Sequence, residues 1–433
     1  MIKRFFKDSA LYSLASLFTK GIGFILLPIY TRVLTKEEYG TYDYLNAIGA
    51  ILTVMVALEI SQAILCYVAE NQEDENTQAK YIATGFWFTV GCYSLIIVLG
   101  YLFRDWLAVL LLDDKSKSEI ILISLAVVFS NAMVYLSTLI FRAKLQSKIS
   151  TLISAVSALF IGSISVLFLL YFEWGLFGLF TGQLVGGVLS FCIACYLLRR
   201  NIFHTPSLLK LKEMLVFSAP LVISSIGVVL ALFADRVFVK EMLGLDDLAV
   251  YSVALRIAGA VSIIVAGFQS ALAPLILAHH KDKQTSKDIA RLFHIYLVFT
   301  LGGVLLLAGA GDMLVLLLAG ESYSKSSSLT VVLCAAILIQ NGYIFFPGMT
   351  LAKKTKLLAV VNIIGACVNL CLNYLLIPIL GLYGAAYATL LSALFVLSLN
   401  VVCSDIFYPI PKNKLSFPFL LSLVVSLYFI QFV

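Results

Sequence analysis

The chain has 433 residues, of which 61% are hydrophobic and only 12% are Asp, Glu, Lys or Arg. Soluble domains carry about 25% charged residues, so this composition argues against a soluble protein and indicates a polytopic membrane protein. The net charge of +6 does not indicate a nucleic-acid-binding protein, because the basic residues are dispersed among short loops and form no patch.

Long apolar runs follow one another along the chain. A spanning helix needs about 20 apolar residues, and these runs do not alternate as barrel strands do, so we expect an all-α polytopic membrane protein. The predicted spanning helices lie at residues 8–34, 41–69, 79–103, 119–142, 149–172, 175–198, 213–240, 247–278, 288–309, 327–352, 356–379 and 381–403. A shorter apolar run at 415–433 predicts one C-terminal accessory helix outside this core.

The distribution of basic residues predicts how the helices cross the membrane. With the N-terminus in the cytoplasm, most of the 30 Lys and Arg residues fall in the inner connections, as the positive-inside rule requires. The outer connections hold few of them: Arg32, Lys36, Arg104, Lys115, Lys117, Lys240 and Lys325. No connection is long enough to fold into a catalytic domain, which argues against an enzyme.

The two halves of the chain resemble each other. At an offset of 209 residues, Ser9-Ala10 falls on Ser218-Ala219 and Ala143-Lys144 falls on Ala352-Lys353; chance similarity between apolar segments is the alternative. Six helices in each half predict two lobes related by a parallel pseudo-twofold around a central cavity, the usual plan of an alternating-access transporter. The predicted parts are an N-lobe at 1–200, a linker at 201–212, a C-lobe at 213–407 and an accessory helix at 408–433.

Three cations fall inside predicted helices, where a charge is costly and usually functional. Lys20 lies about 18 Å into the first helix, and Arg256 lies near the middle of its helix, each on a stripe of small and polar residues. Arg236 lies in the outer third of its helix, where snorkelling or a structural ion pair is the alternative. We expect all three to face one water-filled cavity and to bind an anionic substrate, because the planar fork of Arg suits phosphate.

Four further charged residues are candidates for gating or coupling: Asp235, Glu59, Asp43 and Arg32. Adjacent residues on a helix point about 100° apart, so Asp235 and Arg236 are expected to meet different partners. Glu59 is predicted inside the second helix, where pairing with a cation, carrying a coupling proton and a structural role are all open. The sequence contains no metal-ligand spacing, nucleotide-binding loop or nucleophile motif, so no catalytic residue is predicted.

The segment GIGFILLPIYTRVLTKEEYGTYDYLNAI, residues 21–48, resembles the start of bacterial lipid-linked polysaccharide flippases. These are the Wzx-type O-antigen and capsule exporters of the multidrug/oligosaccharidyl-lipid/polysaccharide superfamily. The specific part is the pattern LPIYTRVLT-EEYG at 27–40. Weaker agreements are the pair Asp235-Arg236 in the predicted helix at 213–240, AKKTK at 352–356 and GLYGAA at 381–386.

The resemblance implies a V-shaped pair of six-helix lobes in the inner cell membrane. It implies movement of undecaprenyl-diphosphate-linked oligosaccharide from the cytoplasmic to the periplasmic leaflet, for O-antigen, lipopolysaccharide or capsule synthesis. From the internal repeat and the distribution of basic residues we predict a monomer. Its implied partners are the lipid bilayer, a polysaccharide polymerase and a chain-length regulator. No cofactor is implied, and coupling to a proton gradient, a sodium gradient or the membrane potential stays open.

Two rival functions follow from the same sequence. A multidrug cation antiporter of this superfamily would favour acidic residues deep in the N-lobe; Glu59 fits it, whereas Lys20 and Arg256 count against it. An intramembrane sugar polymerase or ligase would need a large outer loop, which is missing from the predicted connections. We therefore predict the flippase and keep the antiporter as the alternative.

Overall fold

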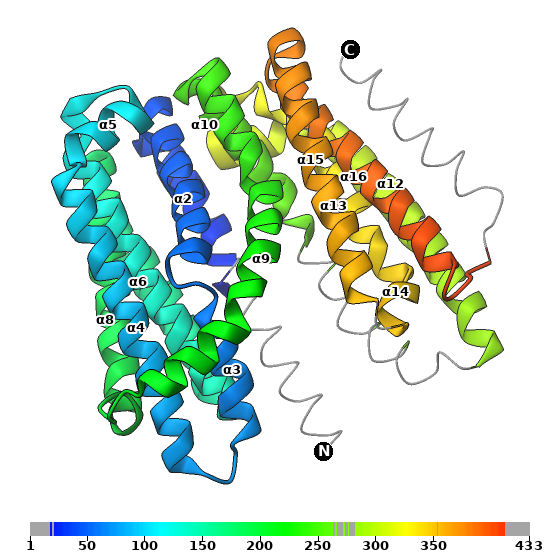
Figure 1. Cartoon of the computed structure of the whole chain (residues 1–433). Helices are drawn as coiled ribbons and strands as arrows, with labels where there is room; N and C mark the ends of the chain where they lie inside the picture. Colours follow the sequence, from blue (N-terminus) through cyan, green and yellow to red (C-terminus); the bar gives the residue numbers. More distant parts are fainter. Residues whose placement is uncertain are drawn as a thin grey trace. The chain divides into compact units, whose positions relative to one another are not determined.

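The computed structural model describes residues 18–19, 21–262, 265, 272, 276, 282–352 and 354–411. In this part of the chain every regular element is a helix and no strand occurs, which confirms the predicted all-α membrane fold. Contacts divide the chain into two compact units, Met1–Val229 and Leu230–Val433, coloured from blue to green and from green to red in Figure 1. This division falls inside a helix, and the lobe boundaries expected from the sequence stay a prediction.

The first unit is a bundle of helices that run side by side (Figure 1). Its described helices are Gly21–Val33, α2 (Lys36–Val56), α3 (Ile60–Glu70), α4 (Glu75–Leu102), α5 (Arg104–Leu112), α6 (Ser118–Ala143), α7 (Ser147–Leu170) and α8 (Gly175–Ile202). Helix α6 lies at the centre, because it contacts α2, α3, α4, α5, α7 and α8.

Helix α9 (Leu208–Leu243) begins in the first unit and ends in the second. It is followed by α10 (Leu245–Gly259), α12 (Lys283–Ala319), α13 (Ser326–Asn341), α14 (Gly348–Leu351), α15 (Thr355–Leu380) and α16 (Leu382–Asp405). Among the described residues, eight helices are long and apolar enough to cross a membrane, or nine if the bent pair α2–α3 is one span. The predicted spans at 8–34 and 247–278 are only partly described, and the accessory helix expected at 415–433 lies outside the described residues.

The single helix expected at 41–69 is broken, so that prediction is wrong. Helices α2 and α3 meet at an angle of 52°. The break contains Leu58 and Glu59, whose φ angles of 48° and 53° are both left-handed. Because neither residue is Gly, Asn or Pro, the usual sequence signals of a break are missing, and the apolar run conceals it.

Two smaller differences have local causes. The span expected at 327–352 is interrupted after α13 by the short 3-10 helix η3 (Gly342–Phe345), and Pro347 follows. Helix α5 was not predicted, because it begins with the polar pair Arg104 and Asp105 directly after α4. Hydropathy assigned these residues to a connection.

The internal repeat predicted from the sequence is present in the helix boundaries. Helix α2 begins at Lys36 and α10 begins at Leu245, 209 residues later. Helix α7 begins at Ser147 and α15 begins at Thr355, 208 residues later. The contacts α2–α6, α4–α6, α6–α8 and α7–α8 of the first unit correspond to α10–α13, α12–α13, α13–α16 and α15–α16 of the second. Chance similarity between apolar segments would not produce this agreement.

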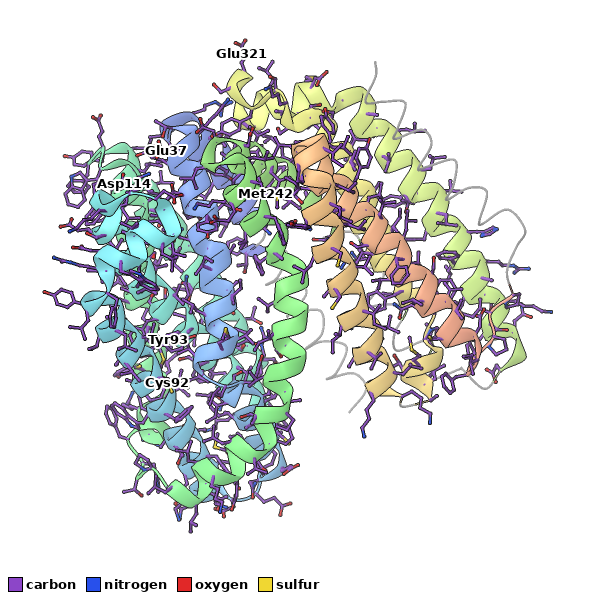
Figure 2. All side chains as sticks on the ribbon, turned by 45° about the horizontal axis from the view of Figure 1, so that its top comes forward. Glu37, Cys92, Tyr93, Asp114, Met242 and Glu321 are labelled. Carbon is purple, nitrogen blue, oxygen red and sulfur yellow. The ribbon has the colours of Figure 1, made fainter. Side chains whose placement is uncertain are left out.

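The start of α2 shows why the motif at 27–40 has its sequence. Thr35 and Glu38 form a capping box, in which the backbone N–H of Glu38 donates to the Thr35 hydroxyl at 3.2 Å and that of Thr35 donates to the Glu38 carboxylate at 2.9 Å. The same carboxylate accepts from the N–H of Leu176 at 3.3 Å. Neighbouring Glu37, which is labelled in Figure 2, pairs with Lys117. The motif therefore ties the start of α2 to two other connections of the first unit.

Two glycines let α7 and α8 approach closely. A Cβ on Gly186 would lie 2.7 Å from the Cα of Ile161, and a Cβ on Gly182 would lie 2.4 Å from the Cα of Ser165. Both contacts are with backbone, which cannot move aside as a flexible side chain can. In a membrane, where helices associate mainly through van der Waals packing, small residues at such crossings are required.

We expect Gly186→Val to separate α7 from α8 and to lower the amount of folded protein in the membrane severalfold. The matched control is Gly91→Val in α4, because a Cβ there would meet nothing within 4 Å. Fluorescence-detected size-exclusion chromatography of tagged variants measures both. Equal amounts of monodisperse Gly186→Val and Gly91→Val protein would contradict the role of the close crossing.

The first turns of α9 are anchored to the first unit. The Lys210 ammonium donates to the Tyr81 hydroxyl at 3.0 Å and to Glu213 at 3.1 Å, and the Tyr81 hydroxyl donates to Glu213 at 2.7 Å. The ring of Tyr81 stacks on Tyr67 with centroids 4.9 Å apart. Met214 is fully buried in the hydrophobic core of the first unit. The helix thus starts at Leu208, inside the linker expected at 201–212.

Candidate functional site

The second unit holds a buried carboxylate, Asp235, on α9. Its side chain accepts a hydrogen bond of 2.6 Å from the Tyr251 hydroxyl on α10. The guanidinium of Arg236 lies 3.7 Å away and also over the ring of Phe233, 5.0 Å from its centroid. The prediction that Asp235 and Arg236 meet different partners is therefore only half right, because each has its own neighbour and they also form a loose ion pair.

Polar side chains continue from this carboxylate into α16 and α15. The Tyr251 hydroxyl lies 3.5 Å from that of Thr389 on α16. One turn on, Ser392 donates to the carbonyl of Thr389 at 2.9 Å and accepts from Asn369 on α15 at 3.2 Å. Asn373 donates to both oxygens of Asn369, at 3.0 and 3.1 Å. We call these six residues, with Asp235 included, the Asp235 network.

The repeat gives this site a counterpart in the first unit. Tyr42 on α2 lies 209 residues before Tyr251. Its hydroxyl accepts a hydrogen bond of 3.0 Å from the amide of Gln183 on α8. The two tyrosines thus link equivalent helices, and the hydroxyl of Tyr251 binds a carboxylate where that of Tyr42 accepts from a neutral amide.

The three acidic or basic candidates of the first unit are spread out. Asp43 is buried in α2, with 7% exposure. Arg32 is exposed, and its guanidinium donates to the carbonyl of Pro28 at 3.3 Å. Glu59 lies at the break before α3 and lines a cavity of about 270 Å³. It was expected inside a helix, and the backbone there instead has a conformation that costs on the order of 1–3 kcal/mol for such residues.

The predicted cations do not all lie in the part of the chain that the structure describes. Arg236 and Arg256 both belong to the second unit, on α9 and α10. The side chain of Arg236 is 17% exposed, and Arg256 is partly buried in the last turn of α10. Lys20 lies outside the described residues. A cavity shared by all three therefore stays a prediction.

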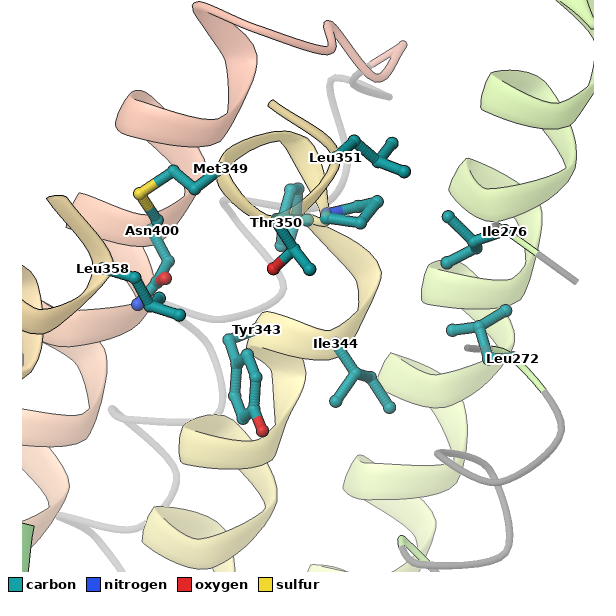
Figure 3. A pocket seen from close by; sticks show the side chains of 11 residues that line it. Leu272, Ile276, Tyr343, Ile344, Met349, Thr350, Leu351, Leu358 and Asn400 are labelled. Carbon is teal, nitrogen blue, oxygen red and sulfur yellow. The ribbon is translucent and has the colours of Figure 1, made fainter. Parts of the chain in front are cut away.

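Another cavity of the second unit contains none of the predicted site residues. It measures about 310 Å³ and is lined mostly by apolar side chains, among them Leu272, Ile276 and Met349 (Figure 3). Its polar side chains include Tyr343 and Asn400, and the Asn400 amide already donates to the carbonyl of Val396 at 2.9 Å. This chemistry suits hydrocarbon better than a charged group.

Sequence reasoning missed the polar partners of Asp235. Tyr251, Thr389 and Ser392 look like ordinary residues of apolar helices. One signal was present: Asn369 and Asn373 are four residues apart, so they share one face of a helix, and amides are uncommon in lipid. Asp235 and Arg236 were found because a charge inside an apolar run is conspicuous. In chemical terms, the network can hold a cation or release Arg236 to an anionic ligand.

Two family models match the chain. The model for "Polysaccharide biosynthesis protein" matches residues 5–280, and the MatE model matches residues 220–375. No curated protein matches. The first match contains the predicted cations and Asp235, and the second contains most of the second unit.

Solved structures of transporters share the fold at low sequence identity. An inward-facing multidrug resistance MATE family transporter of the MOP superfamily is 14% identical, with a TM-score of 0.72 over 90% of this chain and 94% of that chain. A single-residue mutant of the Vibrio cholerae MATE transporter VcmN gives a TM-score of 0.64 at 14% identity, over 92% of this chain and 96% of that chain. A Pyrococcus furiosus MOP superfamily transporter, described by a binding pocket of reverse polarity, gives 0.63 at 14% identity, over 92% and 95%.

Proposed function

This chain belongs to the polysaccharide biosynthesis protein family, and on that premise we propose that it is a lipid-linked oligosaccharide flippase. It moves undecaprenyl-diphosphate-linked oligosaccharide from the cytoplasmic to the periplasmic leaflet of the inner membrane by alternating access, for O-antigen or capsule synthesis. The observation that carries the proposal is the family match over residues 5–280, because that segment contains Lys20, Arg236 and Arg256. These three cations suit a diphosphate.

The proposed mechanism assigns a role to each charged residue. Lys20, Arg236 and Arg256 bind the diphosphate, since charge-assisted hydrogen bonds to phosphate are the strong ones. When the substrate leaves, Asp235 takes over Arg236, which already lies 3.7 Å away. Asp43, Glu59 and Arg32 act in gating or in coupling to an ion gradient or the membrane potential. The lipid tail stays in the bilayer throughout.

The cellular setting is part of the same proposal. The N-terminus faces the cytoplasm, and the protein works as a monomer in the inner membrane. A polysaccharide polymerase and a chain-length regulator receive the translocated product. The positive-inside distribution of Lys and Arg supports this orientation.

A multidrug cation antiporter is the second candidate. It is favoured by the MatE match over residues 220–375 and by the shared fold of the MATE transporters. An antiporter of organic cations would use buried acids such as Asp235 and Asp43, which have 5% and 7% exposure. It would have no use for Arg256 or Lys20 on the face of a substrate cavity.

Purified protein in proteoliposomes separates the two functions. We expect a fluorescent undecaprenyl-diphosphate oligosaccharide to become accessible in the opposite leaflet, read out by a membrane-impermeant quencher, at least severalfold faster than in protein-free vesicles. Ethidium efflux driven by a proton or sodium gradient is the matched assay for an antiporter. Ethidium efflux together with lipid translocation at the protein-free rate would overturn the flippase in favour of the antiporter.

A further inference from the structure

A cavity of about 330 Å³ lies in the first unit, between α2, α4, α5 and α6. Its lining residues are apolar except Ser124, whose hydroxyl already donates to the carbonyl of Ile121 within α6 at 2.8 Å. Such a lining suits a hydrocarbon better than a group that carries charge or forms hydrogen bonds. All of the lining residues belong to the first unit, so the cavity does not depend on the placement of the second.

The cavity opens at the apolar surface of α4 and α5. Leu99, Phe103 and Trp106 line it and are also exposed, and Leu95 and Val98 extend the exposed apolar surface along α4. Helix α4 is long and apolar enough to cross a membrane, so this surface faces hydrocarbon. Lipid tails therefore reach the opening directly from the bilayer.

The depth of the cavity corresponds to a single leaflet. Ile121 and Val128 lie about 5 and 15 Å along α6 from its first residue, Ser118. On α4, the lining residues from Ile96 onward lie within about 9 Å of its last residue, Leu102. Half of the hydrocarbon core of a bilayer measures about 15 Å. The cavity is therefore about as deep as one lipid tail reaches from the headgroups.

The residues around the start of α5 mark the level of the lipid headgroups. Figure 1 shows α5 at one end of the first bundle. Tyr101 and Trp106 are exposed there, and exposed Tyr and Trp are typical of the boundary between hydrocarbon and water. The guanidinium of Arg104 lies over the ring of Tyr101, 5.3 Å from its centroid. This cation stands in the chain between Phe103 and Trp106, two residues of the cavity wall.

Two cations share one carboxylate at this level. Asp105 lies 3.7 Å from Nε of Arg104 and 3.1 Å from Nζ of Lys115, which leaves one positive charge in excess among the three side chains. A phosphodiester carries one negative charge, and charge-assisted hydrogen bonds from Arg or Lys to phosphate are the strong ones. Asp113 and Asp114 follow α5, so the connection as a whole is not basic. The local charge suits a single phosphate rather than a lipid with excess negative charge.

An occupant of the cavity would stabilise this part of the bundle. An empty apolar cavity destabilises a protein, because its walls lose van der Waals contacts. Helices in a membrane associate mainly through such contacts, so a hydrocarbon chain supplies packing that the side chains leave out. Helix α5 has only 9 residues and is too short to be stable in isolation, so it gains most from this packing.

We propose that this cavity binds one acyl chain of a bilayer phospholipid, whose phosphodiester contacts Arg104 and Lys115. The lipid comes from the leaflet at the α5 end of the bundle, which the distribution of basic residues predicts to be the outer one. The bound chain holds α5 against α4 and α6. The inference goes beyond the proposed function, since a flippase and an antiporter would both accommodate this site.

Native mass spectrometry of the purified full-length protein in detergent counts bound lipids and gives their dissociation constants. We expect one molecule of dioleoyl phosphatidylglycerol, or one of dioleoyl phosphatidylethanolamine, to bind with similar affinity. Dioleoylglycerol, which has the same chains and no phosphate, should bind severalfold more weakly. Arg104→Gln combined with Lys115→Gln should lower the affinity for both phospholipids severalfold and leave that for dioleoylglycerol unchanged.

Variants that fill the cavity test its location. Leu107→Trp on α5 and Ser124→Leu on α6 add side-chain atoms at the cavity wall, so each should lower the affinity for phospholipid severalfold. The matched control is Leu110→Trp, at an exposed position of α5, which should bind as the unmodified protein does. Because the two filling side chains come from different helices, either variant tests the site if the other does not fold.

Three outcomes would count against parts of this account. Equal affinity for phospholipid in Leu107→Trp, Ser124→Leu and Leu110→Trp would overturn the proposal, and so would dioleoylglycerol that binds as tightly as the phospholipids. Undecaprenyl phosphate that displaces phosphatidylglycerol at lower concentrations than phosphatidylethanolamine does would also overturn it and assign the cavity to the tail of a transported lipid. Phospholipid binding without any translocation of oligosaccharide lipid would overturn the flippase and leave this site intact.

Discussion

We expect Arg256→Ala to reduce surface polysaccharide about tenfold or more in a flippase-deficient strain that expresses it, while the protein remains at normal abundance in the membrane. The reason is energetic. A hydrogen bond to a charged group contributes about 1.5–3 kcal/mol, and about 1.4 kcal/mol corresponds to a tenfold change in affinity. Losing the proposed phosphate contact at Arg256 should therefore account for a reduction of this size. Arg256→Lys should recover part of it, because the charge is kept while the planar fork is lost.

The control for this experiment is an arginine whose side chain is exposed to solvent. Arg291 on α12 pairs with Asp288 at 3.8 Å, and its side chain is 76% exposed, so Arg291→Ala should leave export unchanged. Lipopolysaccharide or capsule immunoblots give the readout, and membrane immunoblots give the abundance. The mechanism with an anionic substrate is wrong if cells export as much polysaccharide with each of three variants as with the unmodified protein: Lys20→Ala, Arg236→Ala and Arg256→Ala. The antiporter would then be the favoured function.

We expect Tyr251→Phe to lower the free energy of unfolding more than Tyr42→Phe does. Both changes keep the aromatic ring and remove one buried hydroxyl at equivalent places of the repeat. At Tyr42 the change removes the hydrogen bond from the neutral amide of Gln183, and a buried neutral group left unsatisfied costs about 1–3 kcal/mol. At Tyr251 the lost partner is the Asp235 carboxylate, and the same penalty is larger for a charged group. Equilibrium unfolding in mixed SDS and detergent micelles measures both free energies of unfolding.

A third variant checks whether Asp235 carries a charge in the folded protein. Asp235→Asn keeps an acceptor oxygen for Tyr251 and removes the charge. In protein that already carries Asp235→Asn, Tyr251→Phe should therefore lower the free energy of unfolding by about as much as Tyr42→Phe does. The opposite result is that, in the otherwise unmodified protein, Tyr251→Phe lowers the free energy of unfolding by no more than Tyr42→Phe does. That result would show that Asp235 is not charged in the folded state.

Most of the fold follows from the sequence because the signals are long. A run of apolar residues as long as that of α7 or α15 specifies a spanning helix almost independently of its context. One of the matches that revealed the repeat, Ala143 with Ala352, falls at the end of a helix in each half.

The break at Leu58 and Glu59 shows what the sequence conceals. Left-handed backbone at two such residues has no local cause, since both prefer a right-handed helix. It persists only because packing of α3 against α4 and α6 outweighs the local preference. Tertiary contacts of this kind have no counterpart in a hydropathy profile.

The charged residues of the candidate site could be predicted from the sequence, whereas their neutral partners could not. Charges within apolar runs, such as Asp235, were found because their residue type alone is unusual in lipid. Their neutral partners were missed, because a Tyr or Thr in a membrane helix is common and its hydrogen bond depends on which helix lies opposite. The loose pairing of Asp235 with Arg236 depends on side-chain rotamers, which the spacing along a helix does not determine.

Helix α9 has a mechanical consequence that its sequence only suggests. Its first turns are held by Lys210 and Glu213 against Tyr81, and Pro220 within it removes one backbone hydrogen bond. From Pro220 to Asp235 the helix extends about 22 Å, so a swing of about 10° at the proline displaces Asp235 by about 4 Å at that lever length. Asp235, Arg236 and Tyr251 all belong to one compact unit, whereas Pro220 belongs to the other. A bend at the proline therefore carries the carboxylate, the guanidinium and the tyrosine together and keeps the 2.6 Å hydrogen bond.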